Sequence, residues 1–448
     1  MEQSDVTLRN PSLVSEDRIS GLPEPLILQI LSSLPTKDVV ATSVLSKRWG
    51  SFWKVVPNLE FESYGNMRRF AENVCKCLLS HKAPVLESLH LKLGNRCEDV
   101  YVGIWVAIAF NRHVREFLLD LNFYEGEPLR FPNCLFCYDE LETLKLKNKV
   151  LLDVPSLVPM KSLKTLHLHS VVYKDNASVR NLFSSCPNLE HLVVRRGCFY
   201  NNVVEFVIFA PSLKTLLLHV PSSGKENMSY VINAPSLEYL NLDELEGYEL
   251  CLSENAFESL VEANIRNVTC LANEMAMGSL KSVKRLSLDL TSLQIAFPIG
   301  VVFDHLVYLE MYSHKMEWWN LLALMLDSSP KLRALKLIGD SLSHKQPWDY
   351  NKKNKDQGKW NEPEHVPECL LFNLETLVWV RHDWVREEEK EVAIYILENA
   401  KQLKKATFTA YPIEAKMHYK LARRREMLSE LDGVVRASSS CELVFPVE

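Results

Sequence analysis

Glycine is scarce in this sequence, with 14 residues among 448. Rossmann-type enzymes need glycine at tight phosphate-binding turns, so the scarcity weighs against an enzyme of this class. Strong charge is also absent, because the formal net charge of −6 indicates neither nucleic-acid binding nor attraction to a membrane. The longest dense apolar run, 100–110, is shorter than the roughly 20 residues of a membrane-spanning helix and predicts a buried helix or strand.

Catalytic and metal-binding motifs are missing too. No G-x-x-x-x-G-K-[ST], H-E-x-x-H or G-x-S-x-G motif occurs. Cys134 and Cys137 form one C-x-x-C, and Cys75 and Cys77 form one C-x-C, without the second ligand set that a zinc ribbon or RING needs. We therefore expect no catalytic activity, no metal and no cofactor, and we interpret these four residues as core or loop thiols.

The first residues of the chain are polar and lack the apolar core of a signal peptide. The 11 cysteines are scattered and odd in number, which favours free thiols in a reducing compartment. We therefore expect the protein in the cytoplasm, the nucleus or both.

A short helical unit is predicted near the N-terminus, where residues 17–57 read DRISGLPEPLILQILSSLPTKDVVATSVLSKRWGSFWKVVP. Pro23 and Pro25 suit the first turn of a helix, where a backbone N–H is dispensable. Apolar residues then recur at helical spacing until a proline ends the helix. Thr36 is a candidate N-cap of a second helix, and Trp49 leads into a third short helical stretch.

This unit has more large apolar side chains than it can bury. Three helices in about 40 residues form too small a core to enclose them all. The surplus predicts either a partner protein that covers the surface or coverage by the rest of the chain.

The segment resembles an F-box, in particular the plant form that begins D-R-I-S-x-L-P and continues through L-P-T-K to L-S-K-R-W. All of these letters are present, at Asp17–Ser20, Leu22, Pro23, 34–37 and 45–49. The resemblance implies binding to the Skp-type adaptor of SCF-type cullin–RING ubiquitin ligases, with a helical apolar face laid against the partner. The implied adaptor contacts are Leu22, Pro23, Leu26, Ile30, Leu31, Leu34, Pro35, Val44, Leu45 and Trp49.

A repeated pattern, L-x-x-L-x-L, follows from about Leu59 at the roughly 22- to 28-residue spacing of leucine-rich repeats. The last two leucines alternate along a short strand and point into a core that only stacked repeats can close, with a parallel sheet on the concave side. The instances begin at Leu86, Leu141, Leu163, Leu189, Leu213, Leu237, Val283, Leu306 and Leu332, with weaker forms at Val114 and Leu260.

The repeats depart from the common form in one respect. Many leucine-rich repeats carry Asn or Cys three positions after the last strand leucine, whereas Lys149, Val171, Gly197, Pro221 and Leu245 stand here. The side-chain ladder that regularises the loops is therefore missing, and we expect an irregular solenoid.

The outward strand positions are the candidate target-binding residues, because they are exposed on a rigid scaffold. His169, Arg195 and His219 should form a column on successive strands about 4.8 Å apart. Imidazoles bind zinc, but the interposed arginine argues against a metal site there. The candidate set is His167, His169, His191, Arg195, His219, Tyr239, Asn241, Asp243, Tyr308, Glu310 and Tyr312, together with Thr165, Thr215, Arg285 and Asp289.

The C-terminal region resembles the FBD domain that closes many plant F-box/leucine-rich-repeat proteins. The resemblance rests on V-P-E-C-L at 366–370, on Y-I-L-E-N-A-K-Q-L-K-K at 395–405 and on S-S-C-E-L-V-F at 439–445. A glycine is usual before the glutamates at 387–391, but His382 and the residues after it stand here. We expect one helical face with Val392, Ile396 and Ala400, strands at 403–408 and 441–445, and a long helix over 413–431 between them, together closing the solenoid.

The sequence thus predicts an α/β protein. It comprises a tail (1–15), a three-helix F-box (16–58), a leucine-rich-repeat solenoid (59–344), a polar loop (345–364) and an FBD cap (365–448). The resemblances imply the substrate-recognition subunit of an SCF-type ligase, which binds the adaptor through the F-box and a target protein through the repeats. Two alternatives remain open, namely an adaptor-bound scaffold outside a ligase and a repeat receptor for a small molecule.

Overall fold

The computed structural model describes residues 21–446 except 64, 95–96, 123–125, 157–159, 198–201, 222–227, 246, 253–256, 269–277, 291–299, 314–317, 340–359, 383–386 and 411–417. The predicted tail, the D-R-I-S letters, most of the polar loop and the start of the last long helix lie outside the described residues, as does the side chain of Cys134.

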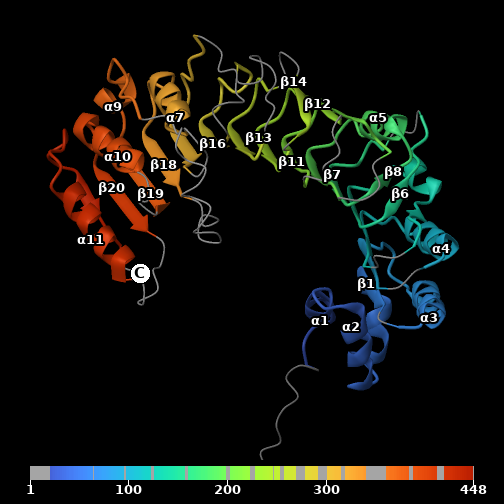
Figure 1. Ribbon diagram of the computed structural model, residues 1–448. Helices are drawn as coiled ribbons and strands as arrows, with labels where there is room; N and C mark the ends of the chain where they lie inside the picture. Colours follow the sequence, from blue (N-terminus) through green and yellow to red (C-terminus); the bar gives the residue numbers. More distant parts are fainter. Residues whose placement is uncertain are drawn as a thin grey trace, which may run out of the picture.

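One parallel sheet of 15 strands runs through the whole arch of the molecule (Figure 1). Each pair of neighbouring strands in it is parallel and joins one repeat to the next, as stacking of one strand per repeat requires. In spatial order the strands are β1 (Asn58–Ser63), β2 (Ser88–Leu93), β3 (Glu116–Leu121), β5 (Thr143–Lys147), β7 (Thr165–His169), β9 (His191–Arg195), β11 (Thr215–His219), β13 (Tyr239–Asp243), β15 (Glu262–Arg266), β16 (Arg285–Asp289), β17 (Tyr308–Tyr312), β18 (Ala334–Ile338), β19 (Thr376–His382), β20 (Lys405–Ala410) and β21 (Glu442–Val444).

The leucine pattern explains why these segments are strands. In β7, Leu166 and Leu168 are buried, while Thr165, His167 and His169 are only half-buried on the other face. The register places Leu166 opposite Leu192 of β9, so the inward leucines of neighbouring repeats stack into one continuous core. The predicted solenoid is confirmed.

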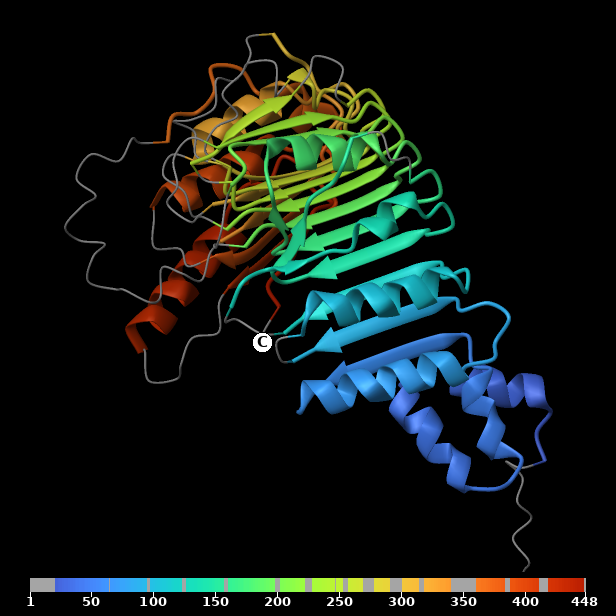
Figure 2. The ribbon, with the colours of Figure 1, turned by 90° about the vertical axis from the view of Figure 1, so that its right-hand side faces the viewer.

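The segments that return between the strands differ from repeat to repeat, as the missing loop ladder predicts. Helices lie along the outer side of the arch near its two ends, and two small three-stranded parallel sheets, with α5 (Asn176–Ser184) between them, lie there in its middle (Figures 1 and 2). The other helices are α3 (Met67–Ser80), α4 (Asp99–Phe110), α7 (Trp318–Asp327), α9 (Glu368–Phe372), α10 (Glu387–Asn399) and α11 (His418–Asp432), with a 3₁₀ turn η3 (Asn133–Cys137). The small sheets are β4 (Leu129–Arg130), β6 (Val150–Leu152) and β8 (Val172–Tyr173), and β10 (Glu205–Phe209), β12 (Ser229–Asn233) and β14 (Glu249–Leu252).

The apolar run at 100–110 forms α4, so the prediction of a regular element is confirmed. Its burial is one-sided, however. Trp105 and Val106 are fully buried against the sheet, whereas Val100 and Ile104 are exposed on the outer side. Among the described residues, no helix is both long and apolar enough to cross a membrane.

The N-terminal helical unit consists of α1 (Glu24–Leu31), α2 (Thr36–Ala41), η1 (Thr42–Val44) and η2 (Trp49–Lys54). The predicted third helical stretch is therefore a 3₁₀ helix, η2. Thr36 does not cap α2, which is a correction to the prediction: it is the first residue of the helix, and its Oγ1 instead accepts a hydrogen bond from the backbone N–H of Glu60 at 2.7 Å. The unit has a small core of its own, separate from that of the solenoid.

The C-terminal region continues the same sheet and does not form a separate body. β19 pairs with β18, and β20 and β21 follow in parallel register. Val392 and Ile396 of α10, and Ala400 directly after it, are fully buried, as their spacing predicts. Leu431 of α11 is also fully buried, so the region closes the core at this end of the arch.

Candidate partner-binding surfaces

Helix α1 is apolar on two sides. Ile27 and Leu31, four residues apart, point into the unit's core and are at most 1% exposed. Leu26 and Ile30 have the same spacing one position earlier, and they are 46% and 51% exposed. Because residues four apart share a helix face, the helix offers one apolar face to its own unit and a second one to solvent.

The segment after α1 adds further exposed apolar side chains. Leu34 is 38%, Leu45 65% and Val44 84% exposed. The prolines 23 and 35 are exposed as well, and Leu22 is half-buried. The described part of the solenoid therefore leaves these predicted contacts exposed to solvent and does not seal them. Val55, which is 37% exposed, joins them without any periodic signal in the sequence.

Two of the predicted adaptor contacts are internal, and this corrects the prediction. Leu31 is 1% and Trp49 4% exposed, so neither can offer much side-chain surface to a partner. Trp49 packs edge-to-face against Phe52, with ring centroids 5.9 Å apart, in the same core as Leu31. Their role is to hold α1 and η2 together behind the exposed residues.

A network of hydrogen bonds joins the helical unit to the first repeats. The backbone N–H groups of Lys82 and Ala83 both donate to the carbonyl oxygen of Lys54, at 2.6 and 3.1 Å. His81, which is 2% exposed, lies 2.7 Å through Nε2 from the carbonyl oxygen of Val56, and Arg112 Nη1 donates to its Nδ1 at 2.9 Å. Burial, together with the Arg112 guanidinium, lowers the pKa of His81, so the ring is neutral at pH 7.

The concave face of the sheet carries the predicted target-binding residues in three columns. The register places His169, Arg195 and His219 opposite one another on β7, β9 and β11, which confirms the predicted column. A second column contains Tyr239 and Tyr308, and the central one contains His167, Asn241 and Glu310. Asp289 is buried, at 5% exposed, and is therefore the candidate that offers the concave face almost no side-chain surface.

In the N-terminal half of this face, Glu116 and Asp120 of β3 are acidic side chains that border the histidines and lysines of the neighbouring strands. On β3, Glu116 accepts hydrogen bonds from Lys145 at 2.8 Å and lies 3.1 Å from His90 Nε2. These contacts, that to His90 first, lower the pKa of Glu116 to about 2. Burial, then the positive charges of Arg195 and Lys147, lowers the pKa of His169.

In the C-terminal half of the concave face, charged side chains form contacts with one another and with tyrosine rings. Arg285 stacks over the ring of Tyr308 at 4.2 Å and lies 3.5 Å from Glu262. Glu310 accepts hydrogen bonds from Lys336 at 2.9 Å and from the Tyr308 hydroxyl at 3.1 Å. Burial, reinforced by Glu310, raises the pKa of Tyr308 to about 12.

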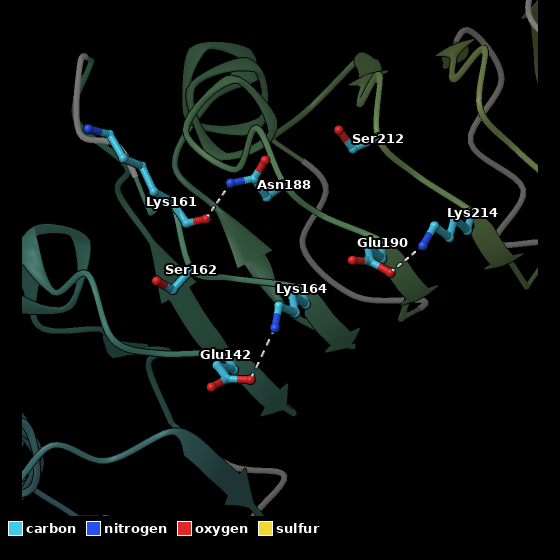
Figure 3. Close-up of a pocket in the computed structure, with 8 residues that line it drawn as sticks. All are labelled: Glu142, Lys161, Ser162, Lys164, Asn188, Glu190, Ser212 and Lys214. Carbon is cyan, nitrogen blue, oxygen red and sulfur yellow. Dashed lines mark hydrogen bonds and ion pairs between the residues drawn. The ribbon is translucent and has the colours of Figure 1, made fainter.

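No site for a metal or an apolar small molecule stands out in the described part of the chain. Groups of three or more His, Cys, Asp or Glu side chains with metal-binding geometry are absent from it. A hollow of about 400 Å³ lies where β5, β7, β9 and β11 begin (Figure 3). Its lining is polar and paired, with Lys214 2.7 Å from Glu190 and Lys164 3.5 Å from Glu142, unlike the mostly apolar pockets that hold small ligands.

Comparison with known proteins matches three family models to this architecture. An F-box domain covers residues 19–61, a leucine-rich repeat residues 162–187 and an FBD domain residues 362–408. An F-box/FBD/LRR-repeat protein of Arabidopsis thaliana is 62% identical over 449 residues, which cover 100% of this chain and 97% of the relative. The chain belongs to the F-box/FBD/LRR-repeat family.

Further Arabidopsis thaliana relatives agree with this assignment. A second F-box/FBD/LRR-repeat protein is 54% identical over 453 residues, covering 99% of this chain and 96% of the relative. An FBD-associated F-box protein is 51% identical over 445 residues, covering 98% and 100%. The helical unit is thus the F-box, and the FBD match begins before α9 and extends into β20.

Proposed function

We propose that this F-box/FBD/LRR-repeat protein is the substrate-recognition subunit of an SCF-type cullin–RING ubiquitin ligase. The F-box binds the Skp-type adaptor, and the concave face of the solenoid binds the target protein. The protein itself contributes positioning, which raises the effective concentration of target lysines near the ligase, and no chemistry. Cytoplasm and nucleus are the compartments that we propose for it.

One observation carries the proposal: the F-box has a surplus of apolar side chains that nothing in the described chain covers. Leu26, Ile30, Val44 and Leu45 are all exposed by two fifths or more. Solvent exposure of several large apolar side chains within about 20 residues is unfavourable for a free monomer and is typical of a protein-binding surface. Large buried anchors dominate the free energy of such interfaces.

The test uses a point variant, because deletion of residues 1–58 would also remove the start of β1, its bond to Thr36, and the Lys54 carbonyl that accepts from Lys82 and Ala83. We expect Leu34→Asp to weaken binding of a purified Skp-type adaptor by about 30-fold or more, the effect of losing an interface anchor. Val435→Asp is the matched control, since Val435 is an apolar side chain 83% exposed at the other end of the molecule. Unchanged adaptor affinity of Leu34→Asp would refute the docking assignment.

Reconstitution separates the ligase from a scaffold that acts outside it. The adaptor complex is combined with cullin, RING protein, conjugating enzyme and ubiquitin, and a target found by proximity labelling is added. We expect ubiquitin transfer to that target, and loss of transfer with Leu34→Asp. Stable assembly without any transfer would favour the scaffold function instead.

A further inference from the structure

The N-terminal half of the concave face carries a cluster of basic side chains, which we call the basic strip. It consists of Lys145, Lys147, His167, His169, His191 and Arg195, the outward charged or titratable residues of β5, β7 and β9. The other outward positions on these strands are two threonines and Val193. The strip is local, because the chain as a whole carries a net charge of −6.

Internal ion pairs neutralise one border of the strip but not its centre. Lys145 pairs with Glu116 at 2.8 Å and Lys147 with Asp120 at 3.7 Å. His169 and Arg195, in contrast, form no ion pair with any described residue, and Arg195 is exposed. Burial and then Lys145 and Lys147 lower the pKa of His167, which is the response expected in a positive environment.

The border on the other side is formed by β11 and β13. His219 of β11 already pairs with Asp243 at 3.2 Å and with Glu244 at 3.6 Å. Beyond it, the arginines of the C-terminal half stack on tyrosines or pair with glutamates. The lowered pKa values of His167 and His169 leave both imidazoles neutral at pH 7. The unpaired positive charge of the strip is therefore carried by Arg195 of β9, in the middle of the N-terminal half.

Two apolar side chains lie among the charged and titratable residues of the basic strip. Val193 of β9 and Leu217 of β11 are neighbours in the central column and are both half-buried. Arg195 flanks Val193 on one side and His191 flanks it on the other, on the same face of the same strand. A ligand that complements this arrangement has carboxylates around an apolar side chain.

We propose that the basic strip binds an acidic segment of the target protein, rich in Asp and Glu and carrying an apolar side chain that packs on Val193 and Leu217. Arg195 provides the planar donor group that pairs with a carboxylate through two parallel hydrogen bonds. The lysines beside it add to the positive field that steers an acidic segment to the concave face, and the neutral imidazoles of His167 and His169 offer hydrogen-bonding groups. The inference rests on the proposed function in that it takes the ligand to be the ligase target.

The test measures fluorescence anisotropy of labelled peptides with the full chain, alone and in complex with a Skp-type adaptor. The first peptide is acidic with one leucine, and the second replaces each Glu and Asp by Gln and Asn. We expect the acidic peptide to bind about tenfold more tightly or better, and its affinity to fall when salt rises from about 0.05 M to about 0.2 M. Arg195→Glu should weaken its binding by about tenfold or more.

Arg180→Glu is the matched control. Arg180 lies on α5, on the outer side of the arch, where it pairs with Glu205 at 2.9 Å. The two variants change the net charge equally, so only Arg195→Glu should alter binding. Equal binding of both peptides, equal effects of both variants, or binding of a single-stranded oligonucleotide as tight as that of the acidic peptide would each overturn the proposal.

The same samples separate this proposal from the proposed function. A chain that assembles with the adaptor but does not distinguish the peptides overturns the acidic-target inference alone. A chain that binds the acidic peptide through Arg195 but fails to bind the adaptor supports the strip and overturns the ligase assignment.

Discussion

The buried His81 should make the junction between F-box and solenoid sensitive to pH. Arg112 can only donate, so His81 Nδ1 must accept, and Nε2–H then donates to the Val56 carbonyl. Protonation would place a second positive charge against the guanidinium. Because the folded-state pKa lies below the usual 6.5, the stabilisation is present above pH 6.5 and is lost as pH falls from there toward the folded-state pKa.

Replacing His81 by leucine measures how much the histidine stabilises the junction. The variant leaves the buried Val56 carbonyl without its donor and Arg112 without its acceptor. Each lost partner costs about 1–3 kcal/mol, so we expect the junction to be destabilised by about 2–6 kcal/mol at pH 7.5. His305→Leu is the control, because His305 is exposed and should tolerate the change within about 0.5 kcal/mol.

Hydrogen exchange read by mass spectrometry is the suitable assay, because a chain with two cores need not unfold in one step. Peptides that cover 52–60 and 78–90 should exchange faster in His81→Leu at pH 7.5 than in the wild type. After correction for intrinsic rates, wild-type protection there should fall between pH 7.5 and pH 5.5, whereas the variant should show no such change. Equal protection of both proteins at pH 7.5, or equal pH dependence, would refute the role of His81.

Further expectations concern local stability. Gly94→Ala should destabilise the first repeats by about 1–3 kcal/mol in thermal unfolding, because an added Cβ would lie 2.5 Å from the backbone carbonyl oxygen of Ser63. Asp175→Ala should cost about 1 kcal/mol and speed exchange in α5, since Asp175 accepts from the backbone N–H of Ser178 at 2.7 Å as the N-cap. The ionised Glu116 stabilises the wild type above about pH 4.5, and this stabilisation is lost as pH falls toward the pKa of about 2. Glu116→Gln should therefore have a lower free energy of unfolding than the wild type at pH 7, and the two values should become equal in acid.

The solenoid was predictable from the sequence because its signal is local and repeated. Alternation of leucine with polar residues needs only two neighbouring positions to define which side is inward, as Leu166 and His167 show. Repetition then implies parallel stacking, and the register follows from it. The return segments carry no such alternation. The choice of helix for α4, the turn η3 and the two small outer sheets therefore required the structure.

The F-box surface was predictable in kind but not residue by residue. Leu26 and Ile27 are adjacent apolar residues on one helix, and their sequence does not say which of them is covered by the unit's own core. The F-box resemblance implied Leu31 and Trp49 as adaptor contacts, but both lie inside the unit's own core, which the sequence pattern does not separate from its outer surface. The pairing on the concave face was likewise out of reach, since the contact of Arg285 with Tyr308 joins residues of different repeats.

The F-box is also the N-terminal cap of the solenoid. The first strand of a parallel stack has an unpaired edge that attracts other strands unless something covers it. Here α2 packs on β1, and Thr36 accepts the bond from Glu60 that a preceding strand would otherwise accept. At the other end, α10, α11 and β21 close the stack in the FBD region. Because one unit both closes the sheet and presents the apolar face, its orientation relative to the basic strip is set by the backbone bonds of β1 and the His81 junction. A bound adaptor and a bound acidic segment would therefore be held at a defined separation. His81→Leu, which weakens this junction, should lower ubiquitin transfer more than it lowers binding of either partner.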